Sequence, residues 1–279
     1  MTGYRYKTRL SKEEYSEVDF KRFRPAASFE VFSVWMDYIN KWFPNEQILF
    51  FNGDSPISFE EGAKAAGIND YEIIAPNSYT YDKSKKYHIK NLPKIDSNYS
   101  FKAVQVQRVE ALKFAYLNNE NFLWIDGDCL INSEILSKLK DVDIAANDIS
   151  HEFMSIDGHF IYISAKRLHE MDNICNVIEF LEGILNGPED KNQGYKSAIL
   201  FEGGLYRLFG YGNMKQIKNI NIAHASSFNH FKRWLELNPL DTDNHRNLLY
   251  LLNNINREKL KDYLFDFEDT FEIENCWHS

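Results

Sequence analysis

The sequence has few cysteines, no excess of basic charge and no long hydrophobic run. Its three cysteines, Cys129, Cys175 and Cys276, are odd in number and lie in no metal-ligand spacing, which favours a reducing, cytoplasmic compartment. The formal net charge of −9 disfavours non-specific binding to nucleic acid or to an anionic membrane. No apolar run approaches the about 18 residues that a membrane-spanning helix needs. We expect a cytoplasmic protein without a signal peptide, a membrane span or a nucleic-acid partner.

A chain of 279 residues is long enough for one large domain, with or without an appendage. The aromatic share of 15% suits a large core and also stacking surfaces for sugars or bases. No internal repeat and no clear linker divide the chain. We expect an N-terminal arm over 1–15, one main domain over 16–234 and a helical C-terminal extension over 235–279.

Hydrophobic periodicity and helix-capping residues predict alternating strands and helices. Helices are expected over 29–43, 58–67, 100–117, 133–139, 165–185, 195–209 and 242–267. Strands are expected at 48–51, 72–75, 122–125, 143–146, 157–163 and 217–223, with a weaker strand pattern at 17–24 and a long polar loop over 76–100. This order predicts an α/β fold with a mostly parallel central sheet flanked by helices, and ligand chemistry at the carboxyl ends of the strands.

Two carboxylates follow the most apolar of these strands. Phe122 to Ile125 form a continuous apolar run, and Asp126 and Asp128 come directly after it, separated by Gly127. Side chains two residues apart point the same way in extended backbone. Like charges this close oppose each other's ionisation unless a cation lies between them. Hard divalent ions such as Mn²⁺ or Mg²⁺ bind carboxylate oxygens and substrate phosphates together, so the pattern predicts a metal and diphosphate site.

Two charged residues lie on helix faces that are otherwise apolar. Arg108 falls within the apolar arc of the 100–117 helix; it either pairs with a core carboxylate or is a cation beside Asp126 that awaits a phosphate. Glu202 lies on the apolar side of the 195–209 helix, followed by two glycines. It is a candidate general base, or a structural glutamate bonded to a helix terminus.

Further candidates lie in segments around the expected strands. His224 ends the strand at 217–223 and precedes a polar segment with Lys232 and Arg233. It is either a polar boundary residue or a third metal ligand with cations for a diphosphate nearby. Asp157 is a candidate substrate contact or a turn residue, as is Asp148, and Tyr81 and Tyr79 are available to stack on a nucleotide base.

Three segments together resemble the nucleotide-sugar glycosyltransferases of GT-A type. They are Phe101-Lys-Ala-Val-Gln-Val-Gln-Arg108, Ala111-Leu-Lys-Phe-Ala115 and Phe122-Leu-Trp-Ile-Asp-Gly-Asp128. The resemblance covers roughly residues 16–234 and implies a Rossmann-like GT-A fold. By this resemblance Asp126 lies near the ribose or the metal, Asp128 is a metal ligand, and His224 is the late histidine that completes the metal shell.

The resemblance implies transfer of a sugar from a nucleoside-diphosphate sugar, most commonly a UDP-sugar, to a hydroxyl of a glycan or another acceptor. Arg108, Asp126, Lys232 and Tyr81 are the residues expected to contact the nucleotide. An inverting enzyme needs a base, for which Glu202 is the first candidate and Asp157 the second; a retaining enzyme can act without one.

Two other classes remain open at this point. In haloacid dehalogenase-like phosphatases, the first Asp of a similar motif is the nucleophile. Here Leu130 stands where that family favours Thr or Val, and the motif lies in the middle of the chain. A non-catalytic sugar- or nucleotide-binding module is the third class, and it has no need of the paired carboxylates.

Overall fold

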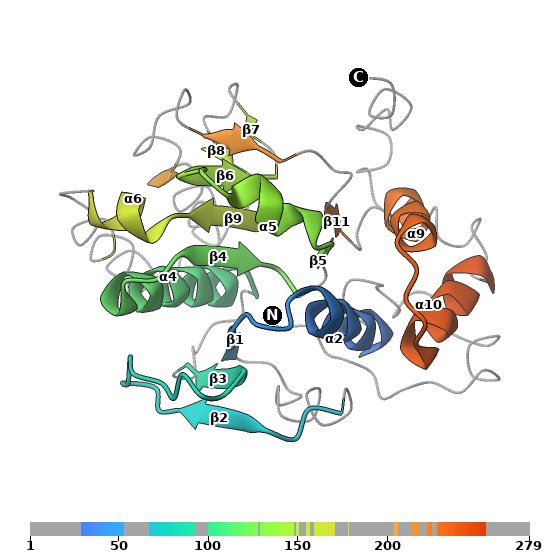
Figure 1. The fold of residues 1–279 in the computed structure, drawn as a ribbon, viewed down its shortest axis with the longest axis horizontal. Coiled ribbons are helices and arrows are strands. Elements are labelled where there is room, and N and C mark those ends of the chain that lie inside the picture. The colour runs from blue at the N-terminus through green and yellow to red at the C-terminus, as the bar shows by residue number, and fades with distance from the viewer. Residues whose placement is uncertain are drawn as a thin grey trace.

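The computed structural model describes residues 29–52, 67–92, 100–127, 129–147, 149–150, 155–156, 159–170, 178, 204–205, 214–217, 222–224 and 228–254. Over these ranges the chain is a mixed α/β structure, with helices packed around several small sheets (Figure 1). None of the helices in these ranges combines the length and the apolar character needed to cross a membrane.

The first sheet has three parallel strands in the order β1-β3-β2. They are β1 (Ile48–Asn52), β2 (Tyr71–Ile74) and β3 (Tyr87–Asn91). The middle strand, β3, lies in the segment that was expected to be a polar loop, and that prediction was wrong. Two of its polar residues, His88 and Lys90, are fully buried, so the polar composition of the segment hides a strand that is covered on both faces.

The second sheet has four strands in the order β10-β6-β9-β4. They are β4 (Phe122–Ile125), β6 (Ile144–Ala146), β9 (Phe160–Ile163) and β10 (Lys215–Gln216). β10 is parallel to β6, but β9 runs antiparallel to both β6 and β4. The expectation of mostly parallel pairing therefore fails for β4. The chain returns from β6 to β9 through the antiparallel pair β7 (Ile149–Ser150) and β8 (Ser155–Ile156) rather than through a crossover helix, and such a return gives antiparallel neighbours.

A two-stranded antiparallel pair, β5 (Cys129–Ile131) and β11 (Ile222–His224), completes the described sheets. The strand expected over 217–223 is thus divided. Ile217 directly follows β10, and β11 begins at Ile222.

The helices partly match the expectations. They are α2 (Phe29–Trp42), α4 (Ser100–Asn118), α5 (Glu134–Leu139), α6 (Ala165–His169), α9 (Phe228–Leu237) and α10 (Asp243–Asn254). The helices expected over 29–43, 100–117 and 133–139 are confirmed. The continuous helix expected over 165–185 is wrong, because α6 ends at His169 with Glu170 as its C-cap. α9 was not expected, and α10 covers the first part of the helix expected over 242–267.

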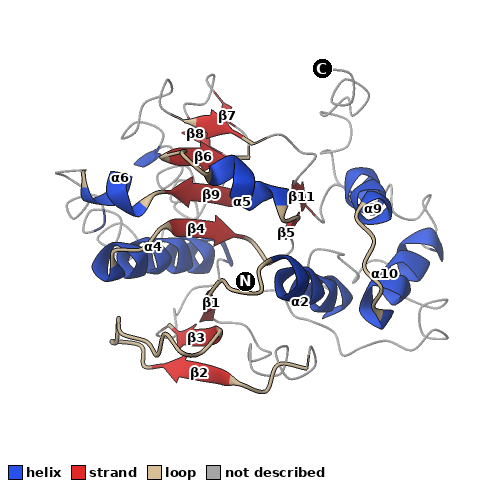
Figure 2. Cartoon of the chain, viewed as in Figure 1, coloured by secondary structure: helices blue, strands red, loops and turns tan. Residues whose placement is uncertain are grey.

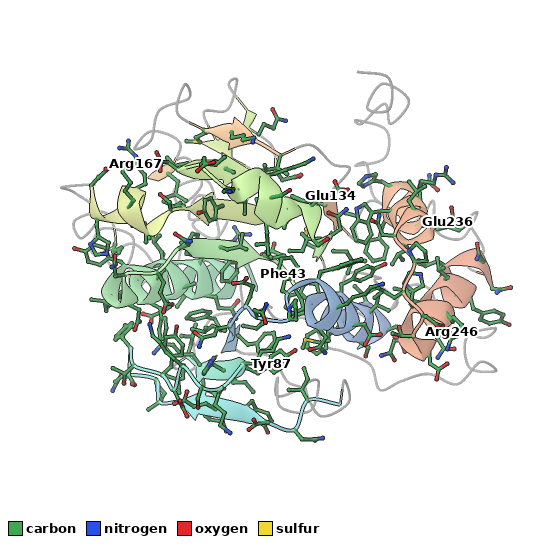
Figure 3. The ribbon with its side chains drawn as sticks, in the orientation of Figure 1. Phe43, Tyr87, Glu134, Arg167, Glu236 and Arg246 are labelled. Carbon is green, nitrogen blue, oxygen red and sulfur yellow. The ribbon has the colours of Figure 1, made fainter. Side chains whose placement is uncertain are left out.

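The helices pack on the sheets in two groups (Figure 2). α4 covers β4 and also contacts β1 and α6, while α9 and α10 pack with each other and α10 packs on α2. Phe43 lies in the core, whereas Glu236 and Arg246 point outward from α9 and α10 (Figure 3). The end of β4 lies between these two groups, where β4 leads into β5.

Candidate active site

Asp126, the first residue after β4, receives hydrogen bonds from three side chains. Trp124 Nε1 donates to Asp126 Oδ1 at 2.6 Å. Arg108 Nη2 lies 3.2 Å from Oδ2 and 3.4 Å from Oδ1, and His159 Nδ1 lies 2.9 Å from Oδ2. Each carboxylate oxygen therefore has two donor contacts, which together account for the roughly four acceptor positions of a carboxylate.

Three neighbouring elements bring these side chains together. Arg108 lies on the inner face of α4, which packs on β4, and its side chain is buried. In the β4–β9 ladder, Ile125 is opposite Phe160, so the next pair outward is Asp126 with His159. The backbone N–H of Asp126 donates to the His159 carbonyl at 3.0 Å. Arg108 thus pairs with the Asp126 carboxylate, which is the first of the two interpretations considered for it, and its role toward a phosphate stays a prediction.

The electrostatic surroundings keep Asp126 ionised. Burial raises the pKa of the Asp126 carboxyl, but the Arg108 charge, the His159 imidazole and the Trp124 hydrogen bond outweigh burial and hold that pKa well below its ordinary value. The Arg108 guanidinium also lies over the Trp124 ring, 5.8 Å from its centroid. The side chains of Asp126 and His159 remain 19% and 40% exposed, so solvent or a ligand can reach this cluster.

His224 is brought next to the acidic motif by the pairing of β11 with β5. The Cys129 N–H donates to the Asp126 carbonyl at 2.9 Å, which closes a turn between β4 and β5. In the antiparallel ladder His224 is directly opposite Cys129, and residues so paired have Cα atoms about 4.5–5.5 Å apart. The backbone of His224 is therefore adjacent to the residue that follows Asp128 in the chain.

Of the expected metal ligands, only Asp126 has a side chain that the structure describes. Asp128 and the side chain of His224 lie outside what the structure describes. Among the described residues, no three His, Cys, Asp or Glu side chains are grouped so as to hold a metal ion. Asp126 is described, and a direct metal bond to its carboxylate requires that one of its present donors be displaced.

The two candidate bases, Glu202 and Asp157, also lie outside the described residues, as does Asp148. Gly204 and Leu205, close after Glu202, are helical, as expected for the 195–209 segment.

Lys232 lies on α9, a helix that contacts β11. Its Nζ is 3.6 Å from Glu236 Oε1, one turn further along the same helix, and the Lys232 side chain is 18% exposed. This pair is of the surface type that contributes little to stability. Lys232 is thus placed on the helix that follows the expected histidine.

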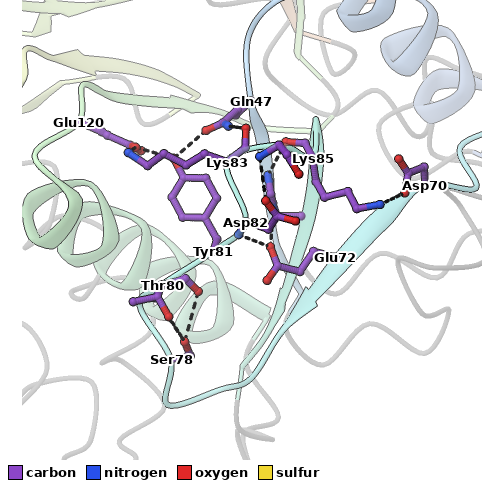
Figure 4. A network of polar contacts seen from close by, with 12 residues as sticks. Gln47, Asp70, Glu72, Ser78, Thr80, Tyr81, Asp82, Lys83, Lys85 and Glu120 are labelled. Carbon is purple, nitrogen blue, oxygen red and sulfur yellow. Dashed lines mark hydrogen bonds and ion pairs between the residues drawn. The ribbon is translucent and has the colours of Figure 1, made fainter.

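Tyr81 has structural contacts at both ends of its side chain. Its hydroxyl lies 2.7 Å from Gln47 Oε1 and also within hydrogen-bond distance of Glu120, and its single hydrogen is shared between these two acceptors (Figure 4). Its ring meets the His88 ring edge-on at 4.8 Å and packs against Phe114. These contacts hold the β2–β3 connection against α4 and the start of β1, and they already use the ring that was expected to stack on a nucleotide base.

His159 is a member of the cluster that the sequence did not identify. Its position at the start of the expected strand 157–163 was visible in the sequence, but its partner was not. Only an antiparallel pairing of that strand with β4 places His159 opposite Asp126, and a mostly parallel sheet was expected.

The sequence matches no protein-family model and no curated protein. Among the described residues, the site consists of one partly exposed, ionised carboxylate, Asp126, with Arg108 and His159 around it at the end of a strand of an α/β structure.

Proposed function

We propose that this protein is a metal-dependent glycosyltransferase of GT-A type that transfers a sugar from a nucleoside-diphosphate sugar to a hydroxyl of a glycan or another acceptor. The observation that carries the proposal is the convergence at the end of β4. Asp126 is held ionised by Arg108 and His159, and strand pairing brings the backbone of His224 beside the end of the Asp126-Gly-Asp128 motif.

The residues divide into two roles. We assign Asp128 and His224 as the residues that would hold Mn²⁺ or Mg²⁺, because carboxylate oxygen suits such ions and the backbone of His224 pairs with Cys129, the residue after Asp128 in the chain. Asp126 lies near the ribose or the metal and fixes Arg108 and His159 beside it. A bound divalent ion supplies positive charge that stabilises the departing diphosphate.

The reaction forms a bond from the acceptor oxygen to the anomeric carbon and breaks the bond from that carbon to the diphosphate. The anomeric carbon has oxocarbenium character in the transition state. In an inverting enzyme the proton of the acceptor hydroxyl passes to a protein base, with Glu202 as the first candidate and Asp157 as the second. Lys232 adds a cation for the nucleotide, and a UDP-sugar is the donor to test first.

The arrangement around Asp126 gives less support to a phosphatase. In that class the Asp126 carboxylate has to attack phosphorus with an oxygen lone pair. Both Asp126 oxygens already accept hydrogen bonds from cationic or aromatic N–H groups, and these bonds lower the nucleophilicity of the carboxylate.

Calorimetric titration tests the proposal, with a panel of nucleotides and sugar nucleotides in the presence of Mn²⁺ or of a chelator. We expect one nucleoside diphosphate to bind only with the metal, and Asp128→Ala to abolish this binding. Asp241→Ala, which changes an almost fully exposed carboxylate before α10, is the matched control and is expected to bind normally. If no nucleotide binds in either condition, the proposal fails, and assays on small phosphoesters decide the phosphatase alternative.

Turnover separates the transferase from a non-catalytic module. Incubation with the sugar nucleotide that binds is expected to release free nucleoside diphosphate in a metal-dependent reaction. Binding without any such release in the presence of a broad acceptor panel favours the module.

A further inference from the structure

His245, in the first turn of α10, is a buried titratable residue outside the candidate active site. The residue is 2% exposed, and its ring meets the Tyr38 ring of α2 with 6.0 Å between centroids. Trp234 of α9 packs edge-on against the same tyrosine at 5.2 Å. His245 therefore lies at the junction of α2, α9 and α10, which pack together (Figure 1).

The hydrogen bonds of Tyr38 determine the tautomer of the His245 ring. The Tyr38 hydroxyl donates its only hydrogen to the Asn238 carbonyl. Burial and the Asp37 charge raise the pKa of this hydroxyl, so it stays protonated. Its oxygen is then the acceptor for His245 Nδ1, 3.3 Å away, and the neutral ring carries its proton on Nδ1. The other ring nitrogen, Nε2, is buried and has no hydrogen-bond partner among the described residues.

Protonation of His245 Nε2 is unfavourable while α10 is docked. It creates a charged N–H donor in a buried position with no acceptor in the described part of the chain, and the desolvation of such a group is costly. The charged groups that act on the ring are Asp37 and Lys41 on α2 and Arg246 on α10 itself. Asp37 favours the charged ring, and the two cations oppose it. From α9 the neighbouring side chain in this aromatic cluster is the uncharged Trp234.

Polar contacts hold the same turn of α10 on α2. Thr242 Oγ1 accepts a hydrogen bond from the His245 backbone N–H at 3.2 Å, which caps the start of α10. The Thr242 hydroxyl also donates to Asp37 Oδ2 at 2.6 Å, and Asn244 Nδ2 donates to the same oxygen at 3.1 Å. Because His245 belongs to this turn, its burial and these contacts to α2 depend on each other.

We propose that His245 is a pH-sensitive switch: its neutral ring keeps the first turn of α10 docked on α2, and protonation of Nε2 releases this turn. The direction follows from linkage. Burial is the largest influence on the docked ring and lowers the pKa of His245 below its ordinary value of 6.5. The released turn therefore binds the proton more readily, so docking is fully favoured above that pH and weakens as the pH falls below it.

Release of α10 also bears on the candidate active site. α9 contacts both α10 and β11, the strand that ends at His224. We expect nucleotide binding to weaken at acid pH when α10 is released. This consequence rests on the proposed function, whereas the switch itself does not.

Hydrogen exchange on the unmodified full chain tests the switch. After correction for intrinsic exchange rates, the opening equilibrium of the α10 amides is expected to rise about threefold to tenfold from about pH 7.5 to about pH 5.5. The upper limit is the roughly tenfold excess of charged over neutral histidine one pH unit below its ordinary pKa. The β4 amides are expected to change by less than about twofold. An unchanged opening of α10 overturns the switch, and so does an equal rise in β4, because it shows that the whole domain opens.

His245→Asn is the matched variant, because its amide nitrogen keeps a donor for Tyr38 but does not titrate. Opening of α10 in this variant is expected to change by less than about twofold between the two pH values. His169→Asn, which changes an exposed histidine on α6, is expected to keep the response of the wild type. A full pH response in His245→Asn contradicts the switch. If that variant does not fold, the comparison of α10 with β4 in the wild type still decides.

Calorimetry with nucleoside diphosphates and Mn²⁺ at both pH values tests the effect on the site. We expect the affinity of the wild type to fall at least about threefold more than that of His245→Asn. Equal losses in the two proteins contradict the coupling between α10 and the site. If no nucleotide binds at either pH, the proposed function fails, and the switch is judged on hydrogen exchange alone.

Discussion

Asp126, which is partly exposed, and Lys90, which is fully buried, are two charged groups that the fold stabilises in different ways. The Asp126 carboxylate contacts the Arg108 and His159 side chains and remains 19% exposed. The Lys90 ammonium is fully buried and donates to backbone carbonyls, at 2.7 Å to Pro76 and 2.6 Å to Ser78. Charged side chains thus contact the Asp126 carboxylate directly, whereas backbone carbonyls accept the hydrogen bonds of the Lys90 ammonium.

This difference separates a candidate functional charge from a structural one. Burial lowers the pKa of Lys90 because carbonyl dipoles do not fully replace water around the ammonium. Lys90 holds the turn after β2 and is closed to ligands. The pKa of Asp126 is lowered because nearby positive charge outweighs burial, and solvent still reaches it. A buried ion pair is weak evidence for stability, so its presence at an accessible strand end favours a role in binding.

The largest expected effect follows from Asp126→Asn. It removes the negative charge that Asp126 supplies to the buried Arg108 guanidinium, and removing one partner of such a pair costs about 3–5 kcal/mol of unfolding free energy. Urea denaturation measures the loss. Metal-dependent nucleotide binding is expected to disappear at concentrations of denaturant where the variant is still folded.

A double-mutant cycle tests whether the loss comes from the pair. Arg108→Met in the Asp126→Asn background removes the charge that Asp126 no longer balances, and we expect it to restore at least about 1 kcal/mol of stability. Strictly additive effects of the two substitutions contradict the proposed pairing.

Lys90→Met is the next largest change and affects the other group. It removes the donor for the carbonyls of Ala75, Pro76 and Ser78, and we expect a loss of about 2–3 kcal/mol in the free energy of unfolding. Nucleotide affinity is expected to stay within about twofold of the wild type. If the Lys90→Met protein is folded but no longer binds nucleotide, Lys90 is not purely structural, and the distinction between Lys90 and Asp126 is wrong.

The two groups act on stability in opposite pH ranges. The folded-state pKa of Asp126 lies below its ordinary value of 3.8, so its contribution is present above that pH and is lost as the pH falls below it. The folded-state pKa of Lys90 lies below 10.5, so the unfolded chain binds more protons up to that pH, and the free energy of unfolding rises with pH over this alkaline window.

Difference curves isolate each contribution. Urea denaturation measures the free energy of unfolding at each pH. The difference in this free energy between the wild type and Asp126→Asn is expected to change mainly on the acid side. The difference between wild type and Lys90→Met is expected to change mainly on the alkaline side. A flat difference curve for either variant contradicts the assignment of that pKa shift.

Local patterns in the sequence predicted β4 and α4 themselves better than they predicted which strands pair with β4. The apolar run 122–125 and the helix over 100–117 were placed correctly because each depends on nearby residues alone. Their pairing depends on contacts between distant segments, so the antiparallel β9, and with it His159, was missed. β3 was missed because His88 and Lys90 are polar in sequence but are satisfied in the structure by Glu72 and by backbone carbonyls.

The smallest expected effect concerns Tyr81, which, like Lys90, we interpret as a structural residue. Tyr81→Phe removes the hydroxyl bonds to Gln47 and Glu120 but keeps the ring against His88 and Phe114. We expect a loss of about 1 kcal/mol in stability and unchanged nucleotide affinity. The control is Tyr250→Phe on the surface of α10, which is expected to change neither quantity.

Tyr81→Leu distinguishes a structural tyrosine from one that stacks on a base. Stacking of a base on an aromatic ring contributes about 1–3 kcal/mol, so loss of the ring at a stacking site lowers nucleotide affinity by tenfold or more while Tyr81→Phe leaves it unchanged. Because the ring is already packed against His88 and Phe114, we expect Tyr81→Leu to lower stability further and to leave affinity unchanged in the folded protein. A tenfold loss of affinity in Tyr81→Leu alone places the nucleotide base at the β2–β3 connection, and the binding site then extends from Asp126 across α4 to this side of the molecule.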